Sequence, residues 1–260
     1  MITELKAVSI SLLISVTFIS IFYIQNIIAP SVAKYKYRLT VIFLAFLFNF
    51  VILIFYDAVH PVYVFGDIVC SFLFILTTVC LFIGPIFQYY FKFISRYRIA
   101  KDKNNFLKSN LRSFIYDFPI IDVIVCPVLE ELLYRYAGGN LWLKANISDL
   151  KVIFLSPLIF GLAHFHHFFE FHGAWQKRLI KCVIQVGFTS LFGFWTTFCW
   201  IKTHGLITCI LLHAFCNYMQ FPDFAEALNW PNISERKVLY TSYISGIIIY
   251  VLLTYIIAKY

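Results

Sequence analysis

Residues 238–258 read VLYTSYISGIIIYVLLTYIIA, a run of 21 residues without Asp, Glu, Lys or Arg. A helix needs about 20 apolar residues to cross the hydrocarbon core of a bilayer, so this run is long enough to span it. Because lipid offers no hydrogen-bond partners to a peptide backbone, a spanning segment of this kind folds as a helix. The run therefore predicts a transmembrane helix and indicates the class of the whole fold.

Further runs of this kind fill most of the chain. Six of them contain no charged residue and cover residues 7–28, 39–56, 68–91, 152–169, 182–201 and 205–221. An eighth segment, 120–143, is equally apolar except for four charged residues. Only 13% of the 260 residues are charged, whereas soluble domains carry about a quarter. The sequence predicts an all-α, polytopic integral membrane protein with about eight transmembrane helices, forming a single domain over residues 1–260.

The first apolar run is expected to stay in the protein as a span. It is too long for the core of a signal peptide, and no small-residue cleavage site follows it. The sequence shows no internal repeat and no soluble domain.

The net charge of +8 does not indicate binding to nucleic acid, because the basic residues follow the loops between the predicted spans. Fifteen of the 21 Lys and Arg residues lie in the four loops after spans one, three, five and seven. By the positive-inside rule these loops mark the cytosolic face, so both termini are expected on the opposite side. The basic stretch 92–112 is expected to be a solvated linker that is attracted to anionic membrane lipid.

The first cluster of ionisable residues inside a predicted span is EELLYR at 130–135. Charged groups are costly in lipid, which makes them functional candidates. Glu131 and Arg135 are four residues apart on a helix, so they share a face and can pair. Glu130 is rotated by about 100° from Glu131 and lacks that partner. We expect Glu131 and Arg135 to hold the helix and Glu130 to be available for chemistry; a purely structural ion cluster is the alternative.

The second cluster is FGLAHFHH at 160–167, near the cytosolic end of the fifth predicted span. His164 and His167 are three residues apart and share a helical face, whereas His166 points elsewhere. His164 lies deepest and is the favoured functional histidine. His166 and His167 are expected to be supporting or interfacial residues.

The third cluster is HAFCN at 213–217, in the seventh predicted span. His213 and Asn217 are four residues apart and project to the same side of a helix. Both side chains can donate hydrogen bonds, which suits the stabilisation of an oxyanion. The alternative is a hydrogen bond between helices, which is common for His and Asn in membranes.

Three such clusters on separate helices of a short chain predict one converging site. A buried glutamate can act as a general base toward water, and a histidine beside it can orient that water or shuttle the proton. A second histidine and an asparagine can then face the carbonyl oxygen, which completes a hydrolase without a covalent nucleophile. A catalytic zinc would use similar groups, but the sequence lacks the H-E-x-x-H motif. Neither a metal nor a cofactor is predicted.

At these residues the chain resembles a known family, the eukaryotic CAAX prenyl protease 2 family of the Ras-converting type. This family lies within the broader group of intramembrane CAAX proteases and bacteriocin-immunity relatives. Its pattern is E-E-x-x-x-R, then F-x-x-x-H, then H-x-x-x-N on successive hydrophobic segments. The chain matches with EELLYR at 130–135, FGLAH at 160–164 and HAFCN at 213–217. The resemblance covers roughly residues 119–223, the motif-bearing core.

The resemblance implies a multi-pass enzyme of the endoplasmic reticulum membrane with an active site open to the cytosol. Such enzymes remove the last three residues, aaX, from proteins whose CAAX cysteine is farnesylated or geranylgeranylated, such as small GTPases. By motif position, Glu130 and His164 would activate the water, while His213 and Asn217 would form the oxyanion site. The residues expected to support them are Glu131, Arg135, Phe160 and His167. The family is implied to use the glutamate rather than a bound metal.

Two other functions would fit the same residues. One is a non-enzymatic membrane protein of the same fold, as the bacterial immunity relatives suggest. The other is a proton-coupled transporter or channel, because carboxylates and histidines in spans also form proton paths. Transporters often show an internal repeat, and the sequence shows none.

Overall fold

The protein is helical throughout the part that the structure describes. This structure is a computed structural model, and it describes residues 2–28, 34–56 and 66–260. These residues contain α-helices, two π-helical segments and one 3₁₀ turn, and they contain no strand. The predicted all-α class is therefore confirmed. The described residues divide into two compact units, Met1–Asp67 with Val125–Ile210 and Ile68–Ile124 with Leu211–Tyr260. A single domain over the whole chain stays a prediction.

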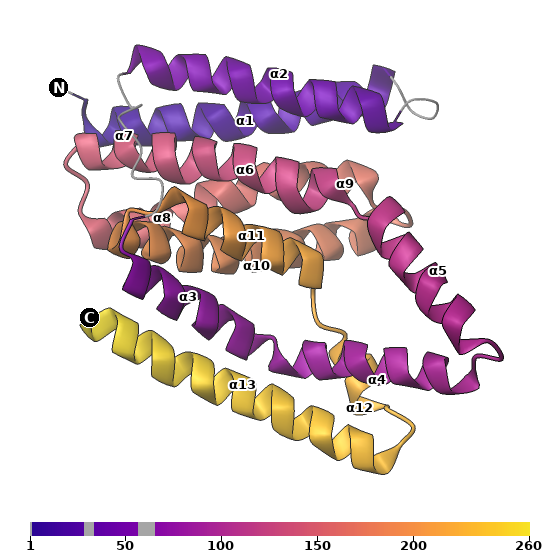
Figure 1. Cartoon of the computed structure of the whole chain (residues 1–260). Coiled ribbons are helices and arrows are strands. Elements are labelled where there is room, and N and C mark those ends of the chain that lie inside the picture. Colours follow the sequence, from indigo (N-terminus) through magenta and orange to yellow (C-terminus); the bar gives the residue numbers. More distant parts are fainter. Residues whose placement is uncertain (1, 29–33, 57–65) are drawn as a thin grey trace. The chain divides into compact units, whose positions relative to one another are not determined.

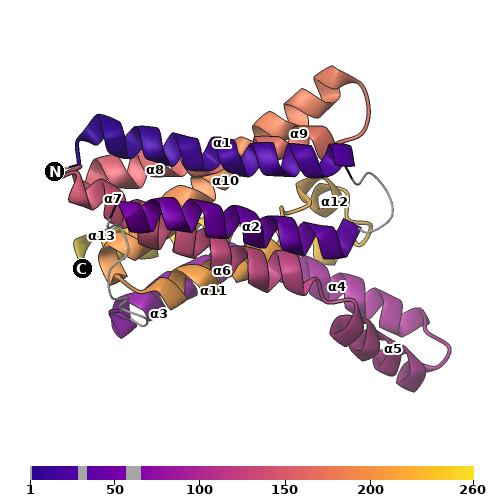
Figure 2. The ribbon, with the colours of Figure 1, turned by 90° about the horizontal axis from the view of Figure 1, so that it is seen from above.

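The first unit is a bundle built around four long helices. In Figure 1, α1 and α2 run side by side, and Figure 2 shows α1 lying along α8. The helices of this unit are α1 (Glu4–Ile28), α2 (Lys34–Phe55), α6 (Cys126–Glu130), η2 (Glu131–Gly138), α7 (Gly139–Lys144), α8 (Asp149–Ala163), η3 (His164–His166), α9 (His167–Glu170) and α10 (Trp175–Thr203).

Small and hydroxyl side chains fix the packing of this bundle. Ser15 of α1 donates a hydrogen bond to the carbonyl of Ile159 in α8, at 3.0 Å. α8 and α10 lie close together at Gly161, where an added Cβ would lie 2.0 Å from the hydroxyl of Ser190. Helices in membranes gain little from the hydrophobic effect against one another, so close contacts of this kind and buried hydrogen bonds hold them together.

The segment that carries the first motif has an unusual backbone. Helical structure runs without a break from Ile121 to Lys144, but Ile121–Val125 (η1) and Glu131–Gly138 (η2) are π-helical. A π-helical turn closes with an i→i+5 hydrogen bond, is rare, and often occurs at functional sites. Glu130 directly precedes the second of these segments, and Glu131 and Arg135 lie within it.

The second unit is organised around its C-terminal helix. α13 lies along α3 and α4 (Figure 1), and Tyr243 of α13 donates a hydrogen bond to Gln88 of α4 at 2.8 Å. Trp230 and Leu239 are buried beside it in a small apolar core. The helices of this unit are α3 (Ile68–Leu81), α4 (Ile83–Ile99), α5 (Lys103–Tyr116), η1, most of α11 (Leu206–Met219), α12 (Phe224–Leu228) and α13 (Ile233–Lys259).

Each of the eight predicted spans overlaps helical structure. Within the described residues, Asp149–Glu170, Trp175–Thr203 and Ile233–Lys259 are long and apolar enough to cross a bilayer, and α3 with α4 would make a fourth span. The chain is thus a helical membrane protein, while the number eight stays a prediction.

The structure adds detail to two of the predicted segments. The predicted span 68–91 is helical but broken, because α3 and α4 are bent by 54° relative to each other. Pro85 lies in the first turn of α4, where a residue without an N–H is tolerated, so a new helix can begin there. The basic stretch 92–112, expected to be a solvated linker, is largely helical and mostly exposed. It contains the end of α4 and most of α5, whose N-terminus is capped by Asp102.

Candidate active site

The first motif provides a fully buried ion pair. Glu131 Oε1 lies 3.1 Å from Arg135 Nη1, and the two side chains are 0% and 2% exposed. The guanidinium of Arg135 also lies over the ring of Phe160, 4.0 Å from its centroid. Gly193 of α10 leaves room for it, since an added Cβ there would lie 3.2 Å from Arg135 Nη2. The pair that the spacing predicts is therefore formed, and it joins the motif helix to α8 and α10.

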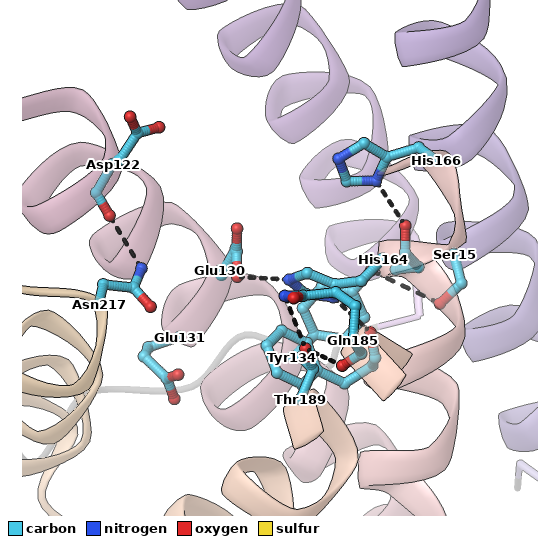
Figure 3. A network of polar contacts seen from close by, with 12 residues as sticks. Ser15, Asp122, Glu130, Glu131, Tyr134, His164, His166, Gln185, Thr189 and Asn217 are labelled. Atoms are coloured by element: carbon cyan, nitrogen blue, oxygen red, sulfur yellow. Dashed lines mark hydrogen bonds and ion pairs between the residues drawn. The ribbon is translucent and has the colours of Figure 1, made fainter. Parts of the chain in front are cut away.

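Glu130 faces a different neighbour, His164 (Figure 3). Its Oε2 lies 3.9 Å from His164 Nε2, and each of the two side chains is 15% exposed. This distance is too long for a direct hydrogen bond, but a single water molecule can bridge two atoms at this separation. The structure thus brings together the two residues that the sequence assigns to water activation, while that role stays a prediction.

The backbone of α8 sets the tautomer of His164. Its Nδ1 lies 3.0 Å from the carbonyl oxygen of Phe160. A carbonyl oxygen only accepts hydrogen bonds, so Nδ1 carries a proton, and in the neutral ring Nε2 then carries the lone pair. The basic nitrogen of the imidazole therefore faces the carboxylate of Glu130, and a water between them could donate one hydrogen to each.

Phe160 and Tyr134 pack around this pair. The ring of Phe160 makes edge contacts with Tyr134 and with His164, at centroid distances of 5.0 and 4.9 Å. Tyr134 follows Glu130 by four residues, and its hydroxyl lies 3.5 Å from the hydroxyl of Ser15. A cavity of about 20 Å³ lies against Tyr134, Arg135 and Phe160, which is room for about one water molecule.

The sequence did not single out Ser15 or Tyr134. The only signal for Ser15 is a hydroxyl within an apolar run, and such residues are common in membrane helices. Tyr134 lies within the quoted motif and is four residues from Glu130, so helical spacing could have indicated it.

The other two histidines of the second cluster form their own contacts. His166 is buried, and its Nδ1 lies 2.8 Å from the carbonyl oxygen of Ala163. His167 Nδ1 lies 2.8 Å from Glu170 Oε2, an acidic partner that the sequence did not indicate. The rings of both histidines have their centroids 6.0 Å from that of His164. His167 therefore lies beside the Glu130–His164 pair, and its supporting role stays a prediction.

His213 and Asn217 belong to the second unit, on α11. His213 is buried. The amide nitrogen of Asn217 donates a hydrogen bond to the carbonyl oxygen of Asp122 at 2.8 Å (Figure 3). An asparagine amide has two N–H groups, so this bond orients the side chain and leaves a second donor on the same nitrogen. The two residues share a face of α11, as their spacing predicts.

The fold and these side chains define a class of protein. It is a helical membrane protein with a carboxylate–imidazole pair held inside a helix bundle, next to a buried ion pair on the same motif helix. Charged groups inside such a bundle mark functional sites.

Comparison with known proteins makes the class more specific. Residues 113–219 match the family model described as type II CAAX prenyl endopeptidase Rce1-like. This segment contains all three motifs, so the resemblance inferred from them is confirmed. No solved structure matches the chain.

Curated proteins similar to this chain are also named as CAAX prenyl proteases. The chain is 35% identical over 133 residues to probable CAAX prenyl protease 2 of Schizosaccharomyces pombe, covering 50% of this chain and 48% of that protein. It is 36% identical over 135 residues to CAAX prenyl protease 2 of Homo sapiens, covering 50% and 40%. For the Caenorhabditis elegans protein of that name the identity is 33% over 141 residues, covering 52% and 51%. The matches thus span about half the length of these curated relatives.

Proposed function

We propose that this protein is an intramembrane endopeptidase that removes the C-terminal aaX tripeptide from prenylated CAAX proteins. The observation that carries the proposal is the Glu130–His164 pair, with its facing atoms 3.9 Å apart inside the segment that matches the Rce1-like family. The names of the curated relatives support the substrate class.

In the proposed mechanism a water molecule lies between Glu130 Oε2 and His164 Nε2 and donates a hydrogen bond to each. Glu130 takes one proton as the water oxygen attacks the carbonyl carbon of the scissile peptide bond. His164 holds the water in line, because its ring is fixed by the bond from Nδ1 to the Phe160 carbonyl. The C–N bond then breaks, and the proton held by Glu130 passes to the leaving amine.

The proposed oxyanion site is formed by His213 and Asn217. In this proposal α11 brings both side chains to the carbonyl oxygen of the substrate. The second N–H of the Asn217 amide donates to the developing negative charge, and a donor of this kind is typically worth about 10²–10³ in kcat. Its bond to the Asp122 carbonyl supports this role, because it fixes the orientation of the amide.

The proposed location is the endoplasmic reticulum membrane, with the site open to the cytosol. A farnesylated or geranylgeranylated tail partitions into the bilayer, so an intramembrane site can meet it directly. Lys177, Arg178 and Lys181, in the first turns of α10, support a cytosolic position for the end of the helix that carries His164. Prenylated small GTPases are the proposed substrates.

Cleavage of a farnesylated CAAX peptide tests the proposal. The purified full-length chain in liposomes is incubated with the peptide, and the released tripeptide is quantified by mass spectrometry, with and without a chelator. Wild type is expected to release aaX in both conditions, and Glu130→Gln is expected to release it at a rate lowered by roughly 10²–10⁴-fold. Glu4→Gln is a matched control, because Glu4 pairs with Lys151 in an exposed ion pair away from the site.

The other outcomes separate the alternatives. Loss of wild-type activity with chelator and recovery with zinc would replace the glutamate mechanism by a metal-dependent one. A well-folded wild type that releases no tripeptide would overturn the protease and favour a non-enzymatic or transport function.

A further inference from the structure

A second cluster of ligating side chains lies at the end of the helix that carries His164. We propose that His166, His167 and Glu170 form a binding site for a divalent transition-metal ion, with zinc as the ion that this donor set suits best. Each residue offers one ligand atom, and these atoms lie within 4.8 Å of one another. The proposed site does not use Glu130 or His164, so it is independent of the proposed protease mechanism.

The local backbone brings the three side chains together. His166 ends the 3₁₀ turn η3, and His167 and Glu170 begin and end the single turn of α9. The change from 3₁₀ to α-helix places the two imidazole rings side by side, with centroids 4.1 Å apart. Glu170 follows His167 by three residues, so its carboxylate returns to the same face.

The hydrogen bond of His166 gives it the form in which histidine binds a metal. Its Nδ1 lies 2.8 Å from the carbonyl oxygen of Ala163, so Nδ1 carries the proton and the lone pair belongs to Nε2. Histidine ligands in metal sites almost always donate the other ring N–H to a carbonyl or carboxylate, which fixes the ring. His166 already has this arrangement.

The other two residues form a pair that an ion could bridge. His167 Nδ1 and Glu170 Oε2 are 2.8 Å apart. Zinc binds histidine nitrogen and carboxylate oxygen at about 2.0–2.2 Å, so an ion in contact with both atoms requires only a small widening of this pair. Two imidazoles and one carboxylate would supply three protein ligands and leave a fourth position for water.

Contacts from α10 hold the backbone of this cluster. Arg178 donates to the carbonyl of Phe168 from Nε and Nη2, at 3.0 and 2.7 Å, and stacks on its ring. Four residues further along α10, the thiol of Cys182 lies 3.6 Å from the carbonyl of Phe165. Ligands on a backbone fixed in this way lose little freedom when an ion binds.

The exposure of the cluster suits entry of an ion from water. His166 is 7% exposed, whereas the side chains of His167 and Glu170 are 23% and 34% exposed. One ligand is thus held in the interior and two are accessible. The cluster lies just before the basic residues 177–181, which mark the predicted cytosolic face.

Direct metal binding tests this proposal without any use of activity. The full-length chain in detergent is stripped with chelator and titrated with Co²⁺, whose absorption reports coordination, and with Zn²⁺ by calorimetry. Wild type is expected to bind one ion per chain. His167→Ala and Glu170→Gln are each expected to weaken binding by at least roughly 100-fold, since loss of a ligand exceeds the 10–100-fold cost of a changed second-shell partner.

His172→Ala is the matched control, because His172 is exposed and lies two residues beyond Glu170, outside the cluster. It is expected to bind as wild type does, and so is Glu130→Gln. Glu170→Gln keeps an acceptor oxygen for His167, and a thermal unfolding curve like that of wild type shows that the fold is kept. Absence of a one-to-one complex in wild type, unchanged binding in both ligand variants, or loss in His172→Ala would each overturn the proposed site.

Discussion

Two neighbouring carboxylates on one helix lie in opposite surroundings. Glu131 is fully buried and 3.1 Å from the guanidinium of Arg135, which in turn lies over Phe160. Glu130 is partly exposed and faces the basic nitrogen of His164 at 3.9 Å. Glu131 thus lies against a fixed cation, whereas Glu130 lies against an imidazole at a distance that one water molecule can bridge. Adjacent residues of identical type thus differ in their surroundings because the helix turns them toward different partners.

The comparison shows how to separate structural charges from chemical ones inside a membrane protein. A charge with a permanent opposite partner and no exposure stabilises the packing, since leaving either partner alone in the interior is costly. A carboxylate that keeps some exposure and faces an imidazole can exchange a proton with water. Substitution of Glu130 should therefore lower tripeptide release, whereas substitution of Glu131 should lower stability.

The largest effect is expected for Glu130→Gln. The amide keeps the shape of the side chain but cannot take a proton, so the rate of tripeptide release should fall by roughly 10²–10⁴-fold, the usual contribution of a general base. The thermal unfolding temperature of the variant in detergent should match that of wild type. A variant that retains wild-type activity would remove Glu130 from the chemistry.

Glu131→Ala should act mainly on stability. It leaves Arg135 buried without its anionic partner, which typically costs about 3–5 kcal/mol. Denaturant titration of the purified protein should show this loss. Replacing both members by leucine should recover much of it, because an apolar pair leaves no buried charge. If Glu131→Ala were as stable as wild type and still inactive, the division between the two faces would be wrong.

Gly193→Ala, on α10, tests the packing around the Glu131–Arg135 pair. The added Cβ would lie 2.8 Å from the Cβ of Pro157 and 3.2 Å from Arg135 Nη2. Overpacking of this kind costs about 1–3 kcal/mol. The unfolding temperature should therefore fall, with tripeptide release per folded molecule changed less than in Glu130→Gln. Gly187→Ala is the control, because an added Cβ there meets no atom within 4 Å.

The smallest effect is expected for Ser15→Ala, on the Glu130 face. Ser15 connects the carbonyl of Ile159 with the hydroxyl of Tyr134, and a hydrogen bond of this kind contributes about 0.5–1.5 kcal/mol. If Ser15 positions the pair, kcat should fall by up to about tenfold with KM little changed, and Ser15→Thr should restore it.

Ser11→Ala provides the matched control for that variant. Ser11 is also buried in α1, but it accepts a hydrogen bond from Trp142, away from the Glu130–His164 pair. It should lower stability and leave kcat unchanged. Equal kcat values in the two alanine variants would show that Ser15 acts only through the fold.

Much of the fold and part of the candidate site could be predicted from the sequence. Long uncharged runs leave no fold but helices in lipid, and a spacing of four residues was enough to pair Glu131 with Arg135. The bend between α3 and α4 was missed, because an uncharged run has the same composition whether it is straight or broken.

Contacts between distant parts of the chain could not be predicted. Ser15 and Ile159 are 144 residues apart in the sequence, and nothing in the apolar pattern of α1 distinguishes this serine from others. The contact between Glu170 and His167 was not predicted, because it depends on the single helical turn His167–Glu170, which the apolar pattern does not show. The convergence of His213 and Asn217 with Glu130 and His164 remains part of the proposal.

The π-helical segment Glu131–Gly138 has a consequence for the spacing of the motif. Its backbone hydrogen bonds run over five residues, one more than in an α-helix. One residue more or less within a helix turns the side chains that follow by about 100°. Deletion of one residue here, for example Leu132, would keep the three charged residues of the motif. It would still turn Arg135 away from its present partners. When related chains are compared, the number of residues between the motif positions should therefore be required to match as well as the residue types.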